Sequence, residues 1–272
     1  MICGLCPRGC SLAEGQTGFC RARANRGGEI VCQNYGRLTS LQLDPIEKKP
    51  LRRFHPGGLI LSAGSYGCNL RCPYCQNSDI SMADERCPTA DVPPEALVAK
   101  ALELVPRGNI GIAYTYNEPL VGYEYVRDCA ALAREAGLCN VLVTNGMINE
   151  QPLCALLPLI DAMNIDLKGF TQEAYDFVGG DLGAVKASIR HAAAVCHVEV
   201  TTLIVPGVTD TEADMEAEAA WLASISPDLP LHISRFFPRY RMSDSHPTPV
   251  AAVYRLRDIA RGRLKYVYTG NC

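Results

Sequence analysis

From Leu59 onward, short apolar runs alternate with amphipathic stretches, and this alternation restricts the fold more than any other feature of the sequence. The apolar runs occupy residues 59–64, 109–116, 141–146, 162–167, 197–207, 230–236 and 264–268. Apolar strands that alternate with helices indicate a parallel sheet buried on both faces. We therefore expect an α/β fold, a partial (β/α)6 TIM-like barrel with its functional site at the carboxyl ends of the strands. A doubly wound open sheet is the alternative.

Residues 1–57 differ in character and are expected to form a small cysteine-rich N-terminal metal-binding segment. They are rich in cysteine and glycine, sustain no helical period, and contain short runs that are typical of small strands and turns. The sequence HPGG at residues 55–58 marks the boundary. Residues 58–272 are accordingly assigned to the partial barrel.

Charge and hydropathy exclude several classes of partner. The formal net charge of −3 provides no general attraction to nucleic acid or to an anionic membrane. No apolar run approaches the roughly 20 residues that a transmembrane helix needs. Cys3, Cys6 and Cys10 stand where a signal segment would have its basic and apolar regions. We therefore expect a cytoplasmic protein without a membrane or nucleic-acid partner.

The cysteines are clustered in a way that indicates metal binding. Of the fourteen cysteines, eight lie within the first 75 residues, and clustered cysteines in a reducing compartment favour metal over disulfides. Cys68, Cys72 and Cys75 follow the spacing C-x3-C-x2-C directly after the first predicted strand. Three thiolates can bind three irons of a [4Fe-4S] cluster and leave the fourth iron open. Half of a zinc site is the alternative, although no second Cys or His pair follows at zinc-finger spacing.

The segment CNLRCPYC, which contains these cysteines, resembles the signature of the radical SAM superfamily. The resemblance implies a partial barrel in which S-adenosylmethionine (SAM) binds the open iron through its amino and carboxylate groups. One electron from the reduced cluster then cleaves SAM to a 5′-deoxyadenosyl radical, which abstracts hydrogen from the substrate. The resemblance also implies an electron donor such as flavodoxin or ferredoxin.

Polar residues at the ends of later strands match positions where that superfamily binds SAM. Asn117 and Glu118 in YNEP resemble its GGE motif, which binds the SAM amino group; a helix cap before Pro119 is the alternative. Thr144 and Asn145 end the third predicted strand, where the superfamily contacts ribose or the methionyl carboxylate. A simple Asn-Gly turn would also explain this pair.

Two further positions complete the expected cofactor shell. Asp166 and Lys168 end the fourth predicted strand and point to the same side of it; an ordinary ion pair is the alternative. Tyr74 lies between the last two cysteines and is expected to shield the cluster or contact the cofactor. No catalytic residue is assigned beyond the cluster. The expected cofactor-binding residues are Tyr74, Asn117, Glu118, Thr144, Asn145, Asp166 and Lys168.

Motifs along nearly the whole chain resemble a narrower group, the radical SAM proteins similar to pyruvate formate-lyase activating enzyme. Within that group the sequence is most similar to the AmmeMemoRadiSam system radical SAM enzymes. The segments that carry this resemblance are CGLCPRGC, DPIEKKPL, SAGSYGCNLRCPYCQN, AYTYNEP, NIDLKGF, HISRFFPRY and KYVYTGN. The resemblance implies a protein or peptide substrate, with a glycyl-radical enzyme as one such partner. The alternatives are a radical enzyme acting on a small molecule or an RNA base, and a non-catalytic zinc-binding interaction module.

The first cysteines of the chain form a second candidate metal site. Cys3, Cys6, Cys10 and Cys20 follow C-x2-C-x3-C-x9-C, and Cys32 is a candidate replacement for one of them. Four thiolates can close a tetrahedral zinc site or bind a second iron–sulfur cluster. A structural zinc would explain how so small an apolar segment stays folded. The sequence therefore slightly favours zinc at this site.

Overall fold

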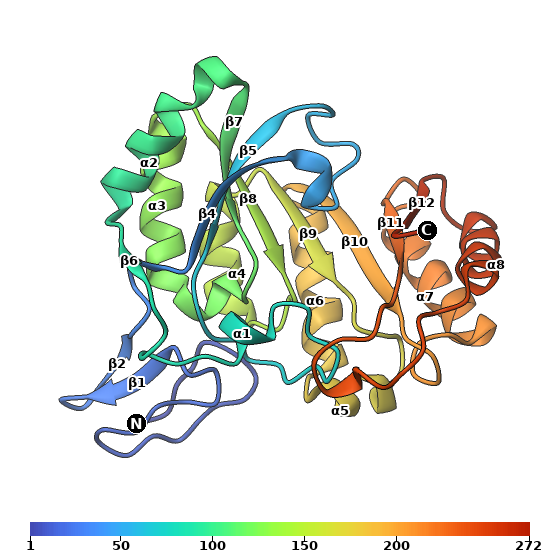
Figure 1. Ribbon diagram of the computed structural model, residues 1–272, viewed down its shortest axis with the longest axis horizontal. Helices are drawn as coiled ribbons and strands as arrows, with labels where there is room; N and C mark the ends of the chain where they lie inside the picture. Colours follow the sequence, from blue (N-terminus) through green and yellow to red (C-terminus); the bar gives the residue numbers. More distant parts are fainter.

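The computed structural model describes residues 1–272 and has one eight-stranded sheet at its centre (Figure 1). Along the sheet the strand order is β12-β11-β10-β9-β8-β7-β5-β4. All neighbouring strands are parallel except β4 and β5, which are antiparallel. The strands are β4 (Ser40–Pro45), β5 (Leu59–Gly64), β7 (Asn109–Tyr114), β8 (Cys139–Thr144), β9 (Ala162–Asp166), β10 (His197–Ile204), β11 (Leu231–Arg235) and β12 (Val267–Gly270).

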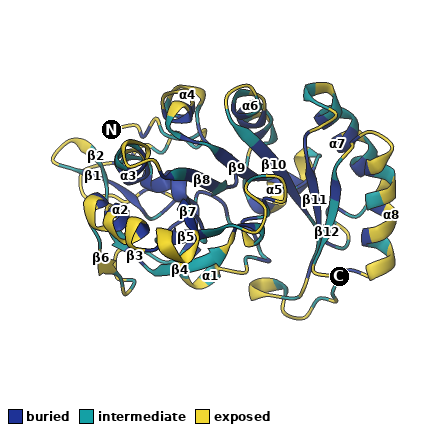
Figure 2. Cartoon of the chain, turned by 90° about the horizontal axis from the view of Figure 1, so that it is seen from above, coloured by how far each residue is buried: buried dark blue, intermediate teal, exposed yellow.

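The strand order explains why the helices cover one face of the sheet. From β5 to β12 each new parallel strand is added on the same side of the previous one, and right-handed connections then place every crossover helix on the same face. Figure 2 shows these helices around the outside of the curved sheet. They are α2 (Pro94–Glu103), α3 (Tyr123–Glu135), α4 (Glu150–Leu156), α6 (Leu182–Ala193), α7 (Glu212–Ile225) and α8 (Val250–Arg261).

The predicted partial barrel is confirmed as an open, mostly parallel sheet, and the doubly wound alternative is wrong because the strand order never reverses. No ladder joins β4 to β12, so the barrel is not closed. Short helices complete the chain. They are α1 (Ser78–Ser81), α5 (Gln172–Val178), and the 3-10 turns η1 (Ile46–Lys48), η2 (Val105–Arg107), η3 (Pro119–Gly122), η4 (Leu157–Leu159) and η5 (Tyr240–Met242).

The N-terminal residues form small strands and turns at the carboxyl end of the parallel strands (Figure 1). Here β1 (Arg23–Arg26) pairs with β2 (Glu29–Cys32), and β3 (Arg37–Leu38) pairs with β6 (Ala90–Asp91). Arg23 fastens this segment to α3, because its guanidinium donates to both carboxylate oxygens of Glu124 at 2.7 Å. The division after residue 57 stays a prediction. Strand β4, which precedes it, pairs along the full length of β5.

Local sequence explains where the helices begin. The side chains of Thr171, Asp181 and Thr211 each accept a hydrogen bond from the backbone N–H three residues later, as N-cap residues do. Pro94 opens α2 at its first turn. No helix combines the length and apolar character that a membrane span requires.

A buried carboxylate closes the amino-terminal end of the barrel interior. Glu199 on β10 accepts hydrogen bonds from the backbone N–H groups of Arg52 and Arg53, at 3.0 and 2.7 Å. It also pairs with the imidazoles of His197 and His232, at 2.9 and 2.5 Å. The segment between η1 and β5 is thereby held across the open side of the sheet. His232 accordingly has a buried partner at the end of the barrel opposite to the cysteine loop.

Candidate functional site

The loop after β5 brings three cysteines to the carboxyl end of the sheet. Cys72 is buried, and Cys68 and Cys75 are partly buried. The backbone N–H of Leu70 donates to the sulfur of Cys68 at 3.3 Å, and Nδ2 of Asn145 donates to the same sulfur at 3.7 Å. Because such donors stabilise a thiolate, Cys68 has the surroundings of a metal ligand.

Burial and neighbouring charges raise the pKa values of two of these thiols, Cys68 and Cys72. Burial raises the pKa of Cys68, and the charges of Glu118, Cys72 and Cys75 act in the same direction. Burial raises the pKa of Cys72 to about 11, against the effect of the Lys168 ammonium. Buried thiols of this kind bind as thiolates when a metal provides the compensating charge. The three-thiol donor set therefore fits the predicted iron–sulfur cluster.

Asn117 holds the cysteine loop in place from the end of β7. Its Oδ1 accepts the backbone N–H of Ser65 at 3.0 Å, and its Nδ2 donates to the carbonyls of Tyr66 and Gly67 at 3.1 and 3.0 Å. The amide thus connects two neighbouring strand ends. The amide oxygen has a second lone pair, which leaves it able to accept a hydrogen bond from the SAM ammonium. That contact stays a prediction.

Glu118, Thr144 and Asn145 form one hydrogen-bonded group across the ends of β7 and β8. Oε1 of Glu118 accepts the Thr144 hydroxyl at 2.7 Å, and Oε2 accepts the backbone N–H of Asn145 at 2.8 Å. Burial raises the pKa of Glu118 to about 7, although hydrogen bonds from Asn145, Thr144 and Leu120 oppose that rise. The fold therefore places three of the predicted cofactor residues in direct contact.

Asp166 and Lys168 lie at the end of β9 and are paired, with Nζ 2.8 Å from Oδ2. Both side chains keep partial exposure, at 33% and 18%. Tyr74 is buried near this pair and packs against Phe177 and Phe236, with ring centroids 6.4 Å apart in both cases. The structure thus places these three predicted residues beside Cys72, while their contact with a cofactor stays a prediction.

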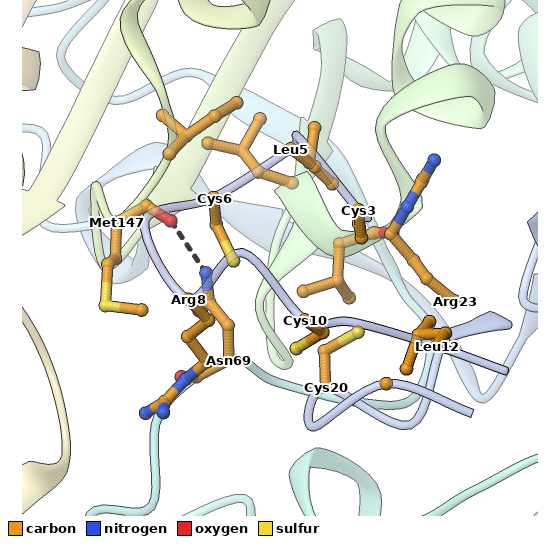
Figure 3. Close-up of a pocket in the computed structure, with 14 residues that line it drawn as sticks. Cys3, Leu5, Cys6, Arg8, Cys10, Leu12, Cys20, Arg23, Asn69 and Met147 are labelled. Carbon is orange, nitrogen blue, oxygen red and sulfur yellow. Dashed lines mark hydrogen bonds between the residues drawn. The ribbon is translucent and has the colours of Figure 1, made fainter. Parts of the chain in front are cut away.

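The four N-terminal cysteines line a single pocket next to this loop (Figure 3). Cys32 does not line it; its thiol donates to Oδ1 of Asn34 at 3.1 Å. The remaining lining residues come from both sides of the junction between the N-terminal segment and the barrel. They are Leu5, Arg8, Leu12, Gly18, Arg23, Asn69, Leu120, Val121, Met147 and Ile148.

Sequence reasoning missed the residues that connect the two groups of cysteines. Asn69 donates to the carbonyl of Met147 at 2.7 Å and accepts from Asn145 at 2.9 Å. Its backbone carbonyl accepts Nε of Arg8 at 2.7 Å. In the sequence, Asn69 is marked only by its position directly after Cys68. Its hydrogen-bond partners lie far away along the chain, so sequence reasoning could not identify them.

Comparison with known proteins adds independent information. The family model described as the radical SAM superfamily matches residues 63–222. An uncharacterized protein of Methanocaldococcus jannaschii is 41% identical over 99% of this chain and 80% of its own length. The pyruvate formate-lyase-activating enzyme of Clostridium pasteurianum is 26% identical over 71% of this chain and 80% of that enzyme.

Among solved structures, Streptococcus suis SuiB has a similar fold, with a TM-score of 0.61 at 11% identity. The match covers 77% of this chain and 48% of SuiB, so this chain spans about half the length of that protein.

Proposed function

Because this chain belongs to the radical SAM superfamily, whose enzymes use a [4Fe-4S] cluster and SAM and need an electron donor, we propose that Cys68, Cys72 and Cys75 hold that cluster. The observation that carries the proposal is the position of the C-x3-C-x2-C loop. It follows the first parallel strand of the sheet, and two N–H donors point at the sulfur of Cys68. When bound, the cluster and SAM supply a 5′-deoxyadenosyl radical for hydrogen abstraction. The protein residues bind, orient and shield these groups.

The proposed SAM-binding residues are those at the neighbouring strand ends. Oε1 of Glu118 accepts two hydrogen bonds, whereas Oε2 accepts one and retains acceptor capacity for an ammonium. Asp166 and Lys168 together offer an acceptor and donors to a polar ligand at the end of β9. Tyr74, Asn117, Thr144 and Asn145 complete the proposed shell, in which Asn117 also positions the cysteine loop.

We propose a protein or peptide substrate, as for an activating enzyme that generates a glycyl radical in a partner. The sequence likeness to the activating enzyme of Clostridium pasteurianum supports this, because it extends over most of both chains. Flavodoxin or ferredoxin is the proposed electron donor. A small molecule or an RNA base is the competing substrate class.

The function is tested with anaerobically reconstituted protein, SAM and dithionite, by measuring 5′-deoxyadenosine. The wild type is expected to form it, and Cys72→Ser is expected to lose this activity because one cluster ligand is removed. Cys154→Ser, at an exposed position on α4, is the matched control and should behave as the wild type. Absence of SAM-dependent 5′-deoxyadenosine, or equal formation by Cys72→Ser, contradicts the proposal.

The substrate class is tested separately with deuterated candidates. Deuterium from a glycine Cα of a polypeptide should appear in 5′-deoxyadenosine. If deuterium enters from a small molecule or a nucleic-acid base alone, the polypeptide proposal fails while the radical SAM chemistry stands.

A further inference from the structure

The pocket at the N-terminus gathers four thiols from a segment of only twenty residues (Figure 3). The backbone holds them there: the N–H of Cys3 donates to the carbonyl of Cys10 at 2.9 Å, and the N–H of Gly9 donates to that of Cys6 at 3.1 Å. Cys3 and Cys20 are buried, while Cys6 and Cys10 are partly buried. The remaining lining is largely apolar. Four clustered thiols under apolar cover are the ligand set of a metal centre.

Two arginine side chains line the same pocket as these thiols. The Arg8 guanidinium stacks over the ring of Phe19 at 3.5 Å and also lines the pocket. Arg23 is buried at another part of its lining. A centre with four thiolate ligands has net negative charge, and the Arg8 guanidinium offsets part of that charge in a site of low dielectric. The Arg23 guanidinium is already paired with the Glu124 carboxylate.

The spacing of the sulfurs distinguishes a cluster from a single ion. Thiolates that bind one zinc at about 2.3 Å in a tetrahedron are about 3.8 Å apart. In this protein no three of the pocket thiols lie within 4.8 Å of one another, and the same is true of Cys68, Cys72 and Cys75. In a cubane each thiolate binds a different iron, so the ligands are held farther apart. Neither set of thiols therefore has the close arrangement of a single zinc site. Because the N-terminal thiols share this property with the thiols of the proposed cluster loop, we favour a cluster there over the zinc that the sequence slightly favoured.

The two cysteine sites are in direct backbone contact. The N–H of Cys68 donates to the carbonyl of Cys20 at 3.1 Å. Gly67 allows this approach, since it has φ +90 and a Cβ there would lie 2.5 Å from the oxygen of Cys20. Arg71 adds a second link, because its guanidinium donates to the carbonyls of Cys68 and Phe19. A ligand of each site is thus hydrogen-bonded to a ligand of the other.

We propose that Cys3, Cys6, Cys10 and Cys20 hold a second [4Fe-4S] cluster, which relays electrons to the cluster at Cys68, Cys72 and Cys75. A reduced ferredoxin or flavodoxin loses one electron to the second cluster, and that cluster passes one electron to the first. No bond forms or breaks in either transfer. The relay rests on the proposed function, whereas metal binding at the four N-terminal cysteines does not.

Metal binding is tested on the full chain with the substitutions Cys68→Ala, Cys72→Ala and Cys75→Ala combined, which leave the N-terminal site untouched. After anaerobic reconstitution this variant is expected to keep about four iron atoms and four sulfides, compared with about eight of each in the wild type. Its Mössbauer spectrum should show a [4Fe-4S] cluster. Stoichiometric zinc without iron, or no bound metal, overturns the proposal, and neither result depends on SAM cleavage.

The relay is tested by replacing Cys10 with Ser and, separately, Cys20 with Ser. Each variant is expected to lose 5′-deoxyadenosine formation driven by reduced flavodoxin and to retain formation driven by dithionite, a small reductant that reaches the first cluster directly. Cys272→Ser, at an exposed thiol outside the pocket, is the control. Unchanged flavodoxin-driven activity in both variants refutes the relay. Loss with both reductants indicates a structural role and also refutes it.

Discussion

Glu218 on α7 should make the protein less stable as the pH rises through neutrality. Its carboxyl is 2% exposed and accepts the hydroxyl of Thr202 at 2.5 Å. Burial raises the pKa of Glu218 to about 8; the bond from Thr202 opposes the rise, and the charge of Asp214 adds to it. Between the ordinary pKa of a glutamate and about 8, the folded protein therefore binds one proton that the unfolded chain has released.

The sign and size of the effect follow from proton linkage. Because the folded state binds more protons, the free energy of unfolding falls as pH rises, by about 1.4 kcal/mol per pH unit. From about pH 5.5 to about pH 7.5 the loss is roughly 2.5 kcal/mol. Glu218→Gln removes the titrating group at nearly constant volume. The free energy of unfolding of Glu218→Gln minus that of the wild type should therefore rise by roughly 2.5 kcal/mol between about pH 5.5 and about pH 7.5.

Anaerobic urea unfolding at several pH values measures the effect, and the single tryptophan, Trp221, reports it from the same helix. Glu118 also titrates near neutrality, but it is present in both proteins and cancels in the difference. Glu216→Gln is the matched control, since Glu216 lies on α7 with a side chain that is 45% exposed and paired with Arg263. A pH-independent difference between wild type and Glu218→Gln would refute the reasoning, because it would mean that Glu218 is ionised in the folded state.

Three further substitutions test the structure elsewhere. Gly67→Ala should lower the iron content of both cysteine sites, because its Cβ would lie 2.5 Å from the carbonyl oxygen of Cys20; an unchanged iron and sulfide analysis would contradict this. For Glu199, burial acts to raise the pKa but hydrogen bonds lower it to about 2, so Glu199→Gln should lose about 3 kcal/mol of unfolding free energy at neutral pH. That difference should disappear as the pH falls through the range from about 4.5 to about 2 in apoprotein urea titrations. Glu124→Gln should cost roughly 1–3 kcal/mol, since it leaves the Arg23 guanidinium buried without its counter-charge; equal urea midpoints would show that the pair is not stabilising.

Features encoded over short stretches of sequence could be predicted. Six strand–helix units were expected from apolar periodicity, and they are present as an open parallel sheet. Strand β4 was not expected to join that sheet, because its pairing with β5 depends on how residues 46–58 fold back. Asn117 was expected as a ligand of an ammonium, but its amide also binds the cysteine loop. Such a role requires knowing which backbone groups lie opposite, and periodicity carries no such information.

The sequence by itself determined the cofactor chemistry, because Cys68, Cys72 and Cys75 lie within one loop whose spacing is local. It also indicated the alternation of strands and helices along the chain, with this loop directly after the first strand of that pattern. Only the tertiary structure decided what surrounds the loop. Cys20 and Cys68 are far apart along the chain, and their hydrogen bond exists because the N-terminal segment packs against the strand ends. The same packing places the four N-terminal cysteines around one pocket beside the loop, an arrangement that sequence spacing alone does not report.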